Sequence, residues 1–387
     1  MNVIYLSPHF PPNFIEFVIG LANRGINVLG IAEDHYDGLD GRLKNSLADY
    51  YQVGSMEDYD QVYRAAAFFC HKWGRIASVE SNNEYWMMLE GKLREDFNIP
   101  GPKIQETINL QKKSEMKKLF IKAGAPVADG IIITDRKSLD EFIKKHGYPV
   151  FAKPDRGVGG AGGFKITNED DVANFWLKKP EDCEYFVEEF VDGALTTFDG
   201  LVNKDGEVEF TSSLYSPNSA HDLLAKNDDL SFYINRVIPA DQEEIGRKCL
   251  KEFNLKARFF HLEFLRKKDG SLIVMEMNCR APGGYTVDLM NYANDVNIYQ
   301  EWANMVAGNH FQEKFERKYY AAHISRKDGK NYLHDNDEIF ASYGDKIASY
   351  QILPPIFADV MGNEAFLVRA KTEEEIADMV KFIQQKA

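Results

Sequence analysis

The chain has 387 residues, and its 44% hydrophobic and 27% charged content is an ordinary balance for a globular protein with a sizeable core. At about 150 residues per domain, this length predicts two or three domains. The 46 basic and 60 acidic residues give a net charge of −14, which argues against nucleic acid and anionic membrane surfaces as partners. The four cysteines form no C-x-x-C pair and predict a reduced, cytoplasmic protein without a disulfide framework or zinc site.

The first hundred residues predict an α/β unit. "NVIYL" at 2–6 is typical of a buried strand, 14–25 has helical spacing, and "INVLGIA" at 26–32 is the next strand. This strand–helix–strand order predicts a parallel sheet. The start lacks the basic region of a signal peptide, and no apolar run reaches the ~18 residues that span a bilayer. Pro/Gly punctuation at 98–103 predicts a domain boundary, so we expect a Rossmann-like α/β domain over 1–104.

The second unit contains a glycine-rich stretch, "FAKPDRGVGGAGGFKI", at 151–166. A Rossmann turn would lead into a helix, but "FKIT" is typical of a strand, and the G-K-[ST] ending of a P-loop is missing. The stretch therefore predicts two strands joined by a glycine loop. Glycine amides can lie close to a phosphate chain because no Cβ blocks the approach, but a plain flexible hairpin explains the stretch equally well.

The segment 259–280 predicts a β-hairpin, because the D-G dipeptide at 269–270 is a strong signal for a two-residue turn. Side chains alternate along a strand, so the turn also fixes which residues face each other. The predicted register pairs His261 with Asn278 and Glu263 with Glu276. On this face Arg280 follows Asn278, whereas the other face is apolar and carries Phe260, Leu262, Phe264, Ile273, Met275, Met277 and Cys279.

The polar face of this hairpin predicts a cation site. Carboxylate and amide oxygens at this spacing suit Mg²⁺, which takes one or two carboxylates together with substrate phosphates. The alternative is a solvated outer face with a few salt bridges. That alternative has a difficulty, because two carboxylates directly opposite each other are destabilising unless a cation lies between them.

Five segments in this order resemble the ATP-grasp superfamily between about 106 and 309. They are Lys113 in "KKSEMKKLFIKAG", Lys153 in "AKP", the glycine loop, "VEEFVDG" and the hairpin ending "EMNCRAPGG". The local match is most similar to the carboxylate–amine ligases, including the L-amino-acid ligase type. The resemblance implies an ATP-grasp domain of two α+β subdomains, a central one with the glycine lid over 105–190 and a C-terminal one with the metal site over 191–310. An α/β extension is expected over 311–387.

The resemblance also implies roles for individual residues. ATP would lie between the subdomains, with its phosphates on Lys113 and Lys153 and beneath a lid formed by Gly157, Gly159, Gly160, Gly162 and Gly163. The base would be held by Glu188, Glu189 and Val191. Mg²⁺ or Mn²⁺ would be bound by Glu263, Glu276 and Asn278. Catalysis would involve Arg280, Lys153 and His261, with His261 orienting a ligand or acting as a base.

One position departs from the family pattern. Members often carry an acidic residue two positions after the hinge glycine, where it binds the ribose hydroxyls, and this chain has Leu195 there. Asp199 is a weak substitute on spacing. Three further segments are candidates for substrate contact: the loop at 7–13, Glu84 after a predicted strand, and the long segment 216–230 with His221, Asp222 and Lys226. The "APGG" turn, with Gly283 and Gly284, leads into a helix whose free amides could hold an anion.

The resemblance predicts an ADP-forming ligase that activates a carboxylate as an acyl phosphate and joins it to an amine. A bicarbonate-activating enzyme of the biotin-carboxylase type, a non-catalytic nucleotide-binding protein and a dinucleotide-dependent oxidoreductase are alternatives. The missing G-x-G-x-x-G counts against the last of these. Expected partners are small-molecule carboxylate and amine substrates. The oligomeric state is open, although members of the family are often dimers, which makes a homodimer one expectation.

Overall fold

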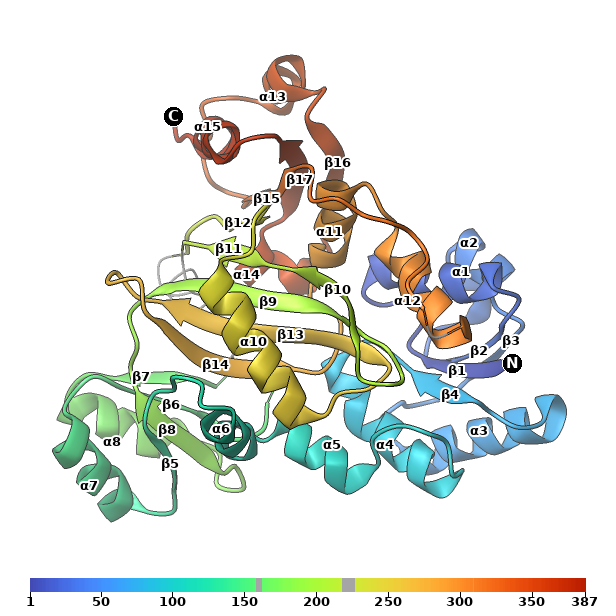
Figure 1. The fold of residues 1–387 in the computed structure, drawn as a ribbon, viewed down its shortest axis with the longest axis horizontal. Helices are drawn as coiled ribbons and strands as arrows, with labels where there is room; N and C mark the ends of the chain where they lie inside the picture. The colour runs from blue at the N-terminus through green and yellow to red at the C-terminus, as the bar shows by residue number, and fades with distance from the viewer. Residues whose placement is uncertain (158–161, 218–226, 309) are drawn as a thin grey trace.

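The computed structural model describes residues 1–157, 162–217, 227–308 and 310–387 (Figure 1). Its strands form a four-stranded sheet near the N-terminus, a second four-stranded sheet, and a nine-stranded sheet that includes the C-terminal strands. Figure 1 shows the N-terminal unit in blue and the small green sheet on either side of the large sheet. The mixed class predicted from the sequence is confirmed. Within the described ranges, no helix is long and apolar enough to cross a membrane.

The N-terminal sheet is parallel throughout, as the strand–helix–strand pattern predicted. Its order is β3 (Asp49–Gln52), β2 (Asn27–Ala32), β1 (Asn2–Leu6) and β4 (Ser78–Glu80). The associated helices are η1 (Pro12–Phe14), α1 (Ile15–Asn23), η2 (Tyr36–Gly38), α2 (Gly41–Ser46), α3 (Tyr59–Trp73), η3 (Glu84–Trp86) and α4 (Met87–Asp96). Because the strands are parallel, the loops after β1, β2, β3 and β4 meet at one edge, which is where open α/β sheets bind ligands.

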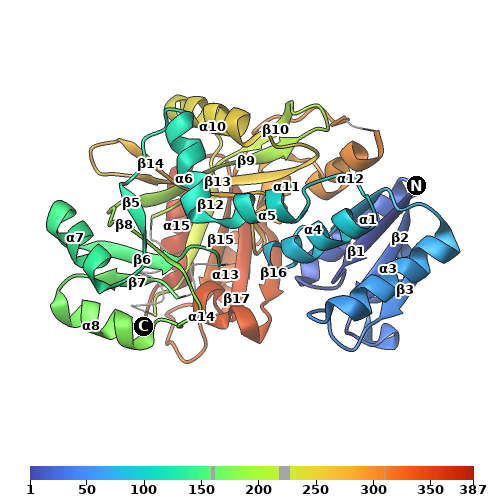
Figure 2. The same cartoon turned by 90° about the horizontal axis from the view of Figure 1, so that it is seen from below.

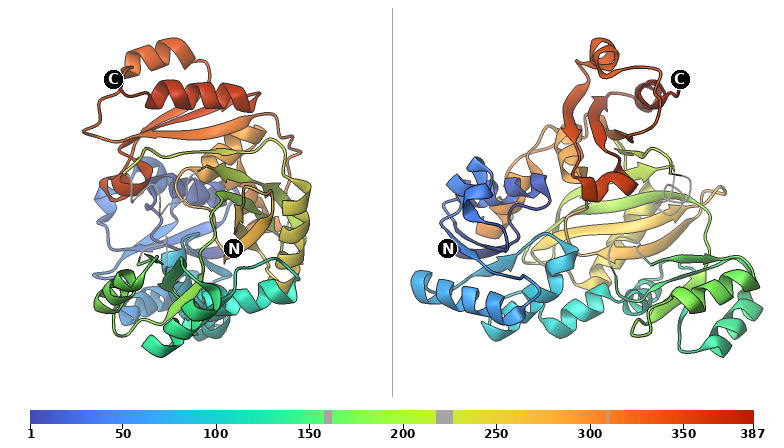
Figure 3. Two further views of the ribbon diagram at one scale, coloured as in Figure 1. Left: turned by 90° about the vertical axis from the view of Figure 1, so that its left-hand side faces the viewer. Right: turned by 180° about the vertical axis from the view of Figure 1, so that it is seen from behind.

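The small sheet is antiparallel and carries the glycine-rich stretch. Its order is β5 (Gly130–Ile133), β8 (Tyr185–Glu189), β6 (Val150–Pro154) and β7 (Phe164–Ile166), and α7 (Arg136–His146) and α8 (Glu169–Lys178) cover it (Figure 3). Helix side chains such as Phe142 and Phe175 share one apolar core with the strands. Val150 pairs with Ile166, so the predicted strand–loop–strand arrangement is confirmed.

Two successive helices precede the small sheet, α5 (Ile104–Gln111) and α6 (Lys113–Lys122). Lys112 between them has an extended backbone. The break has a physical cause, because the Lys113 N–H donates to Asp155 O at 2.8 Å and the Ser114 N–H donates to the Asp155 carboxylate at 2.8 Å. The start of α6 is therefore fastened to the loop after β6, which places Lys113 beside the glycine stretch.

The large sheet combines the hairpin with the C-terminal strands. Its order is β14 (Leu272–Asn278), β13 (Arg258–Arg266), β9 (Ala194–Val202), β11 (Leu214–Ser216), β12 (Ser231–Ile234), β15 (Tyr320–Arg326), β17 (Glu364–Ala370) and β16 (Ile347–Ile352), with β10 (Val208–Ser212) on β9. The tail thus continues the sheet of the preceding unit. It contains α13 (Asn336–Tyr343), η4 (Pro355–Phe357), α14 (Ala358–Met361) and α15 (Glu373–Gln384).

Helices α10 (Ala240–Phe253) and α6 lie together against this sheet, as Figure 2 shows. Phe120 of α6 and Phe253 of α10 have ring centroids 5.2 Å apart, and both belong to the core that contains Val274 and Met277 of the hairpin. This shared core holds α6, and with it Lys113, beside the hairpin whose polar face is predicted to bind a cation. On the side of the N-terminal unit, α11 (Thr286–Asn294) and α12 (Ile298–Gly308) pack with α1 into a second shared core.

The hairpin has the predicted pairing at its functional end, although its turn differs from the prediction. His261 pairs with Asn278 and Glu263 with Glu276. However, the Lys267 N–H donates to Ser271 O at 2.9 Å, so the loop has three residues and ends at Gly270, whose φ is +86°. A bulge between Glu263 and Phe264 then restores the predicted register by skipping one residue.

Because of the same bulge, the prediction for part of the apolar face is wrong. Because the register shifts, Leu272 and Val274 enter the core, whereas Ile273 and Met275 are only half-buried. Met277 and Cys279, which lie beyond the bulge, are buried as predicted, and so are the three hydrophobic residues of the first strand, Phe260, Leu262 and Phe264.

Candidate active site

The polar face of the β13–β14 hairpin forms a compact cluster of ligand-type side chains. Asn278 Nδ2 donates to Glu263 Oε1 at 3.1 Å, and His261 Nε2 lies 3.2 Å from the same oxygen. Glu276 lies opposite Glu263 in the ladder and pairs with Lys113 Nζ at 3.0 Å. The residues predicted to bind a metal are thus close together, and Lys113 from α6 joins them.

A second group of buried charges lies next to this cluster, on the small sheet. Lys153 Nζ of β6 is 2.6 Å from Glu188 Oε1 of β8, and Lys117 Nζ of α6 is 3.0 Å from Glu188 Oε2. Glu188 is 1% exposed, and the two lysines are about nine-tenths buried. Burial favours the neutral carboxyl, but Lys153 and Lys117 outweigh it and hold the pKa of Glu188 below its usual value.

Lys117 is not among the site residues that the sequence predicts. Lys117 lies one helical turn after Lys113, so helical spacing alone places both lysines on one face of α6. In the structure both Glu188 oxygens contact lysine ammonium groups, which suits a residue that positions Lys153. The contact of Glu188 with the base of a nucleotide stays a prediction.

The remaining residues expected at the base lie at the end of β8. The Glu189 N–H donates to Asp129 O at 3.0 Å, so this amide is already used within the protein. The Glu189 carboxylate lies 3.1 Å from His146 Nδ1. Val191 lies in the connection between β8 and β9 and is half-buried. Contact of Glu189 and Val191 with a base stays a prediction.

The glycine stretch is described only at its two ends. Gly157 O lies 3.5 Å from Lys113 Nζ, and Gly162 O accepts a hydrogen bond from the Tyr185 hydroxyl at 3.2 Å. Gly162 has φ +76°, and a Cβ there would lie 3.2 Å from Pro154. Gly163 leads into β7, while the predicted lid residues Gly159 and Gly160 lie outside the described ranges. The first described end of the stretch, Gly157, therefore lies beside Lys113, and the second, Gly162, lies beside Tyr185.

His261 lies between two carboxylates. Its Nδ1 is 2.6 Å from Asp199 Oδ1 and its Nε2 is 3.2 Å from Glu263 Oε1. Burial favours the neutral ring, but Asp199 and Glu263 outweigh it and raise the pKa of His261 to about 9. A ring with this pKa is protonated at neutral pH, and the role of His261 in orienting a ligand or as a base stays a prediction. Its geometry suits a residue that holds Glu263 in place.

Asp199 has a structural position that spacing along the sequence does not reveal. It lies on β9, directly opposite His261, is fully buried, and accepts a hydrogen bond from the Thr197 hydroxyl at 2.5 Å. It therefore orients His261, and its burial argues against the ribose contact that was weighed for it. Leu195, on the same strand, pairs with Leu265 of β13.

Arg280 connects the hairpin cluster to a cavity. Its Nη2 is 2.9 Å from Glu84 Oε2 and 3.4 Å from Asn278 Oδ1. The cavity has a volume of about 670 Å³ and lies where the loops after β1, β2, β3 and β4 meet the end of β14. Its lining includes Ser7, His9, Phe10, Glu33, Asp34, Glu57, Glu84, Arg280, Gly283, Gly284 and Phe357. The suggested cleft position of Glu84 thus agrees with the structure, where the Asn83 side chain caps η3.

The loop at 7–13 lines this cavity and is fixed to the helix that follows the hairpin. Asn13 Nδ2 donates to Gly284 O at 3.0 Å and to the Asp288 carboxylate of α11 at 2.8 Å. Burial raises the pKa of Asp288 to about 6, against the hydrogen bonds from Asn13 and Tyr299. Gly284 has φ +60°, which suits glycine. These contacts join the N-terminal unit to the "APGG" turn.

The long segment 216–230 is described only at its ends. Asp229 accepts a hydrogen bond from the Tyr332 hydroxyl at 2.9 Å and pairs with Lys330 Nζ at 2.9 Å. The end of the segment is thus fixed to the C-terminal extension. His221, Asp222 and Lys226, the candidates for substrate contact, lie outside the described residues.

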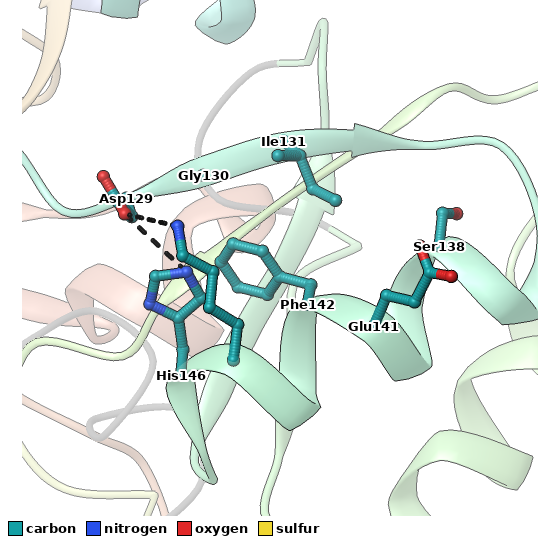
Figure 4. Close-up of a pocket in the computed structure, with 8 residues that line it drawn as sticks. Asp129, Gly130, Ile131, Ser138, Glu141, Phe142 and His146 are labelled. Carbon is teal, nitrogen blue, oxygen red and sulfur yellow. Dashed lines mark hydrogen bonds and ion pairs between the residues drawn. The ribbon is translucent and has the colours of Figure 1, made fainter.

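Another cavity, of about 390 Å³, lies between α7 and β5 (Figure 4). Ligand-type atoms of Asp129, His146 and Glu189 lie within 4.8 Å of one another at its edge. Lys145 Nζ is 3.3 Å from the Asp129 carboxylate, however, so a cation of the protein already occupies that side. None of the hairpin residues lines this cavity.

The hairpin cluster fits a divalent cation. Burial raises the pKa of Glu276, Lys113 opposes this, and the like charges of Glu263 and Glu84 add to it. Lys113 is paired with Glu276 and His261 with Glu263, so each carboxylate of the cluster has a cationic partner of the protein. Two carboxylates with an amide oxygen are the donor set that Mg²⁺ takes alongside phosphate oxygens. Glu263, Glu276 and Asn278 are the residues that would hold the ion.

Comparison with known proteins shows which family and which enzymes this chain is similar to. Residues 146–288 match the family model of the ATP-grasp domain. The chain is 24% identical to an L-arginine-specific L-amino acid ligase of Bacillus subtilis over 293 residues, 73% of this chain and 69% of the relative.

Solved structures show the same fold over almost the whole chain. An L-amino acid ligase from Bacillus licheniformis has a TM-score of 0.76 at 15% identity and covers 98% of this chain and 96% of its own. A biotin carboxylase domain of Hydrogenobacter thermophilus 2-oxoglutarate carboxylase, solved with MgADP and bicarbonate, has a TM-score of 0.71 at 17% identity. The match covers 98% of this chain and 88% of that domain's chain. The motif order, the sheets and the family match agree: the chain contains an ATP-grasp domain, preceded by a parallel α/β unit.

Proposed function

We propose that the protein is an ATP-dependent carboxylate–amine ligase that forms an amide bond and releases ADP and phosphate. The position of Arg280 carries the proposal. Its guanidinium contacts Asn278, one of the residues that would hold the metal ion, and it also lines the cavity of about 670 Å³. A carboxylate bound there by Arg280 would lie at the boundary between the phosphate side and the substrate side.

The reaction follows from the groups at this boundary. A carboxylate oxygen of the first substrate attacks the γ-phosphorus of ATP, ADP leaves, and an acyl phosphate results. The amine of the second substrate then attacks the acyl carbon, phosphate leaves, and the nitrogen loses a proton. Positioning and charge neutralisation supply most of the catalysis in phosphoryl transfer, so no protein nucleophile is required.

The protein's own residues would neutralise and position the reacting groups. Lys113 and Lys153 are buried ammonium groups whose present partners are Glu276 and Glu188, and both would contact phosphate oxygens of ATP. His261 holds Glu263, and Glu84 holds Arg280. Bound Mg²⁺ would offset the negative charge of the phosphates.

The cavity is lined by Arg280 and by loops of the N-terminal unit, and it offers room for small molecules. Two of the proteins named above are L-amino acid ligases, so pairs of L-amino acids are the first substrates to test. The Bacillus subtilis relative is specific for L-arginine. A bicarbonate-activating reaction is the second candidate, because the same fold occurs in a biotin carboxylase domain.

The test is a phosphate-release screen of the full chain with ATP, Mg²⁺ and amino acids taken in pairs, together with bicarbonate plus biotin. The proposal expects phosphate and ADP from at least one amino acid pair and a dipeptide by mass spectrometry. Release with bicarbonate and biotin alone would favour the second candidate. AMP and pyrophosphate would indicate adenylation, and nucleotide binding without turnover would indicate a non-catalytic nucleotide-binding protein. A homodimer is checked separately from the mass in solution.

A further inference from the structure

The lining of the cavity beside Arg280 contains more acidic than basic side chains. Arg280 pairs with Glu84. The lining also includes three exposed carboxylates, Glu33 and Asp34 after β2 and Glu57 after β3. Among the described residues that line the cavity, Arg280 is the single lysine or arginine, so no such side chain of the lining offsets the three carboxylates.

The contacts of these three carboxylates are with uncharged donors or with histidine. Glu33 accepts a hydrogen bond from the Met56 N–H at 2.6 Å, and Glu57 accepts one from the Tyr85 hydroxyl. Asp34 lies 2.8 Å from His9 Nε2. Burial lowers the pKa of His9 against the effect of Asp34, so this ring adds little positive charge at neutral pH.

Two further features of this cavity indicate a ligand. His9 Nδ1 is buried and has no hydrogen-bond partner among the described residues, so a polar ligand atom would satisfy it. The rings of Phe10 and Phe357 stack with centroids 5.7 Å apart and line the cavity, although they come from opposite ends of the chain. Aromatic faces favour cations and the methylene stems of lysine and arginine side chains.

We propose that one substrate of the ligase is an amino acid with a cationic side chain, selected by Glu33, Asp34 and Glu57 in the lining of the cavity beside Arg280. The inference rests on the proposed function and specifies its substrate class. The α-carboxylate or the α-amine would lie at Arg280, where the reaction takes place. The cationic group would lie at the three carboxylates, with its aliphatic stem along the rings of Phe10 and Phe357.

The test compares arginine with citrulline, which has nearly the same shape but no charge. Calorimetry measures the binding of each to the full chain, independently of turnover. Arginine should bind about tenfold more tightly, as expected for one hydrogen-bonded charge pair. The double variant Asp34→Asn/Glu57→Gln should remove this difference. Asp37→Asn, whose exposed side chain lies outside the cavity lining, is the matched control and should keep it.

Turnover is measured on the same proteins as ADP release, so the two proposals can fail separately. Equal affinity for arginine and citrulline, or a preference that survives in the double variant, would overturn the substrate class even if the enzyme ligates neutral amino acids. A charge-dependent preference without ADP release under any substrate pair would support the binding site and overturn the ligase. In an active enzyme, the double variant should raise KM for arginine and leave kcat and KM for ATP unchanged.

Discussion

Glu188 holds two buried lysines in place, and its replacement by glutamine should destabilise the ATP-grasp domain. The carboxylate is 1% exposed and lies 2.6 Å from Lys153 Nζ and 3.0 Å from Lys117 Nζ. Glutamine keeps the size and one oxygen acceptor but removes the negative charge. In Glu188→Gln, the two buried ammonium groups of Lys153 and Lys117 would therefore lose the negative charge that now neutralises them.

The size of the effect can be estimated from these distances. At 3.0 Å and an effective dielectric constant of about 20, one such charge pair is worth roughly 5 kcal/mol of Coulomb energy. Much of this offsets the desolvation of the ions, and breaking a buried pair from one side typically costs about 3–5 kcal/mol. Because glutamine retains a hydrogen-bond acceptor, we expect a loss of about 3 kcal/mol in the free energy of unfolding.

The assay is urea unfolding combined with hydrogen exchange of peptides from β6 and β8, which report on this sheet directly. Glu188→Gln should shift the unfolding midpoint, speed exchange in these strands and raise KM for ATP through displacement of Lys153. Glu169→Gln, an exposed partner of Arg136 in the same unit, is the control and should change stability by less than about 1 kcal/mol. Adding Lys117→Met to Glu188→Gln should recover part of the loss. Wild-type stability and exchange in Glu188→Gln would refute the reasoning.

Two further predictions concern the metal cluster and a buried histidine. Glu276→Ala should abolish ADP release while leaving the circular dichroism spectrum unchanged; normal turnover in the folded variant would remove Glu276 from the metal site. His323 is fully buried, and burial lowers its pKa to about 4 despite a 3.4 Å contact with Met361 O. Between pH 6.5 and 4 the unfolded chain therefore binds a proton that the folded chain does not, so stability falls as the pH falls, by up to about 3 kcal/mol. The difference in unfolding free energy between wild type and His323→Phe should follow this slope, and a pH-independent difference would contradict it.

Local patterns in the sequence were sufficient for several parts of this site. Alternation and turn chemistry act over a few residues, so the strand–glycine loop–strand unit and the pairing of Glu263 with Glu276 could be predicted. The pairing was reached through two local deviations that cancel, a three-residue loop and a bulge. Neither could be derived from the D-G signal, because the packing of Leu272 and Val274 against the core decides which residue is skipped.

Contacts between distant segments were decided by the tertiary structure. Asp199 meets His261 because β9 pairs with β13 in one register, and Glu188 meets Lys117 because α6 packs between the two sheets. The same is true of the cavity, whose wall brings Phe10 beside Phe357 across almost the whole chain. Periodicity shows which face of an element is apolar, whereas the packing of complete cores determines which faces meet. The sequence by itself determined the kinds of residues available for phosphate and metal, and the fold determined which charges are paired and what the cavity can hold.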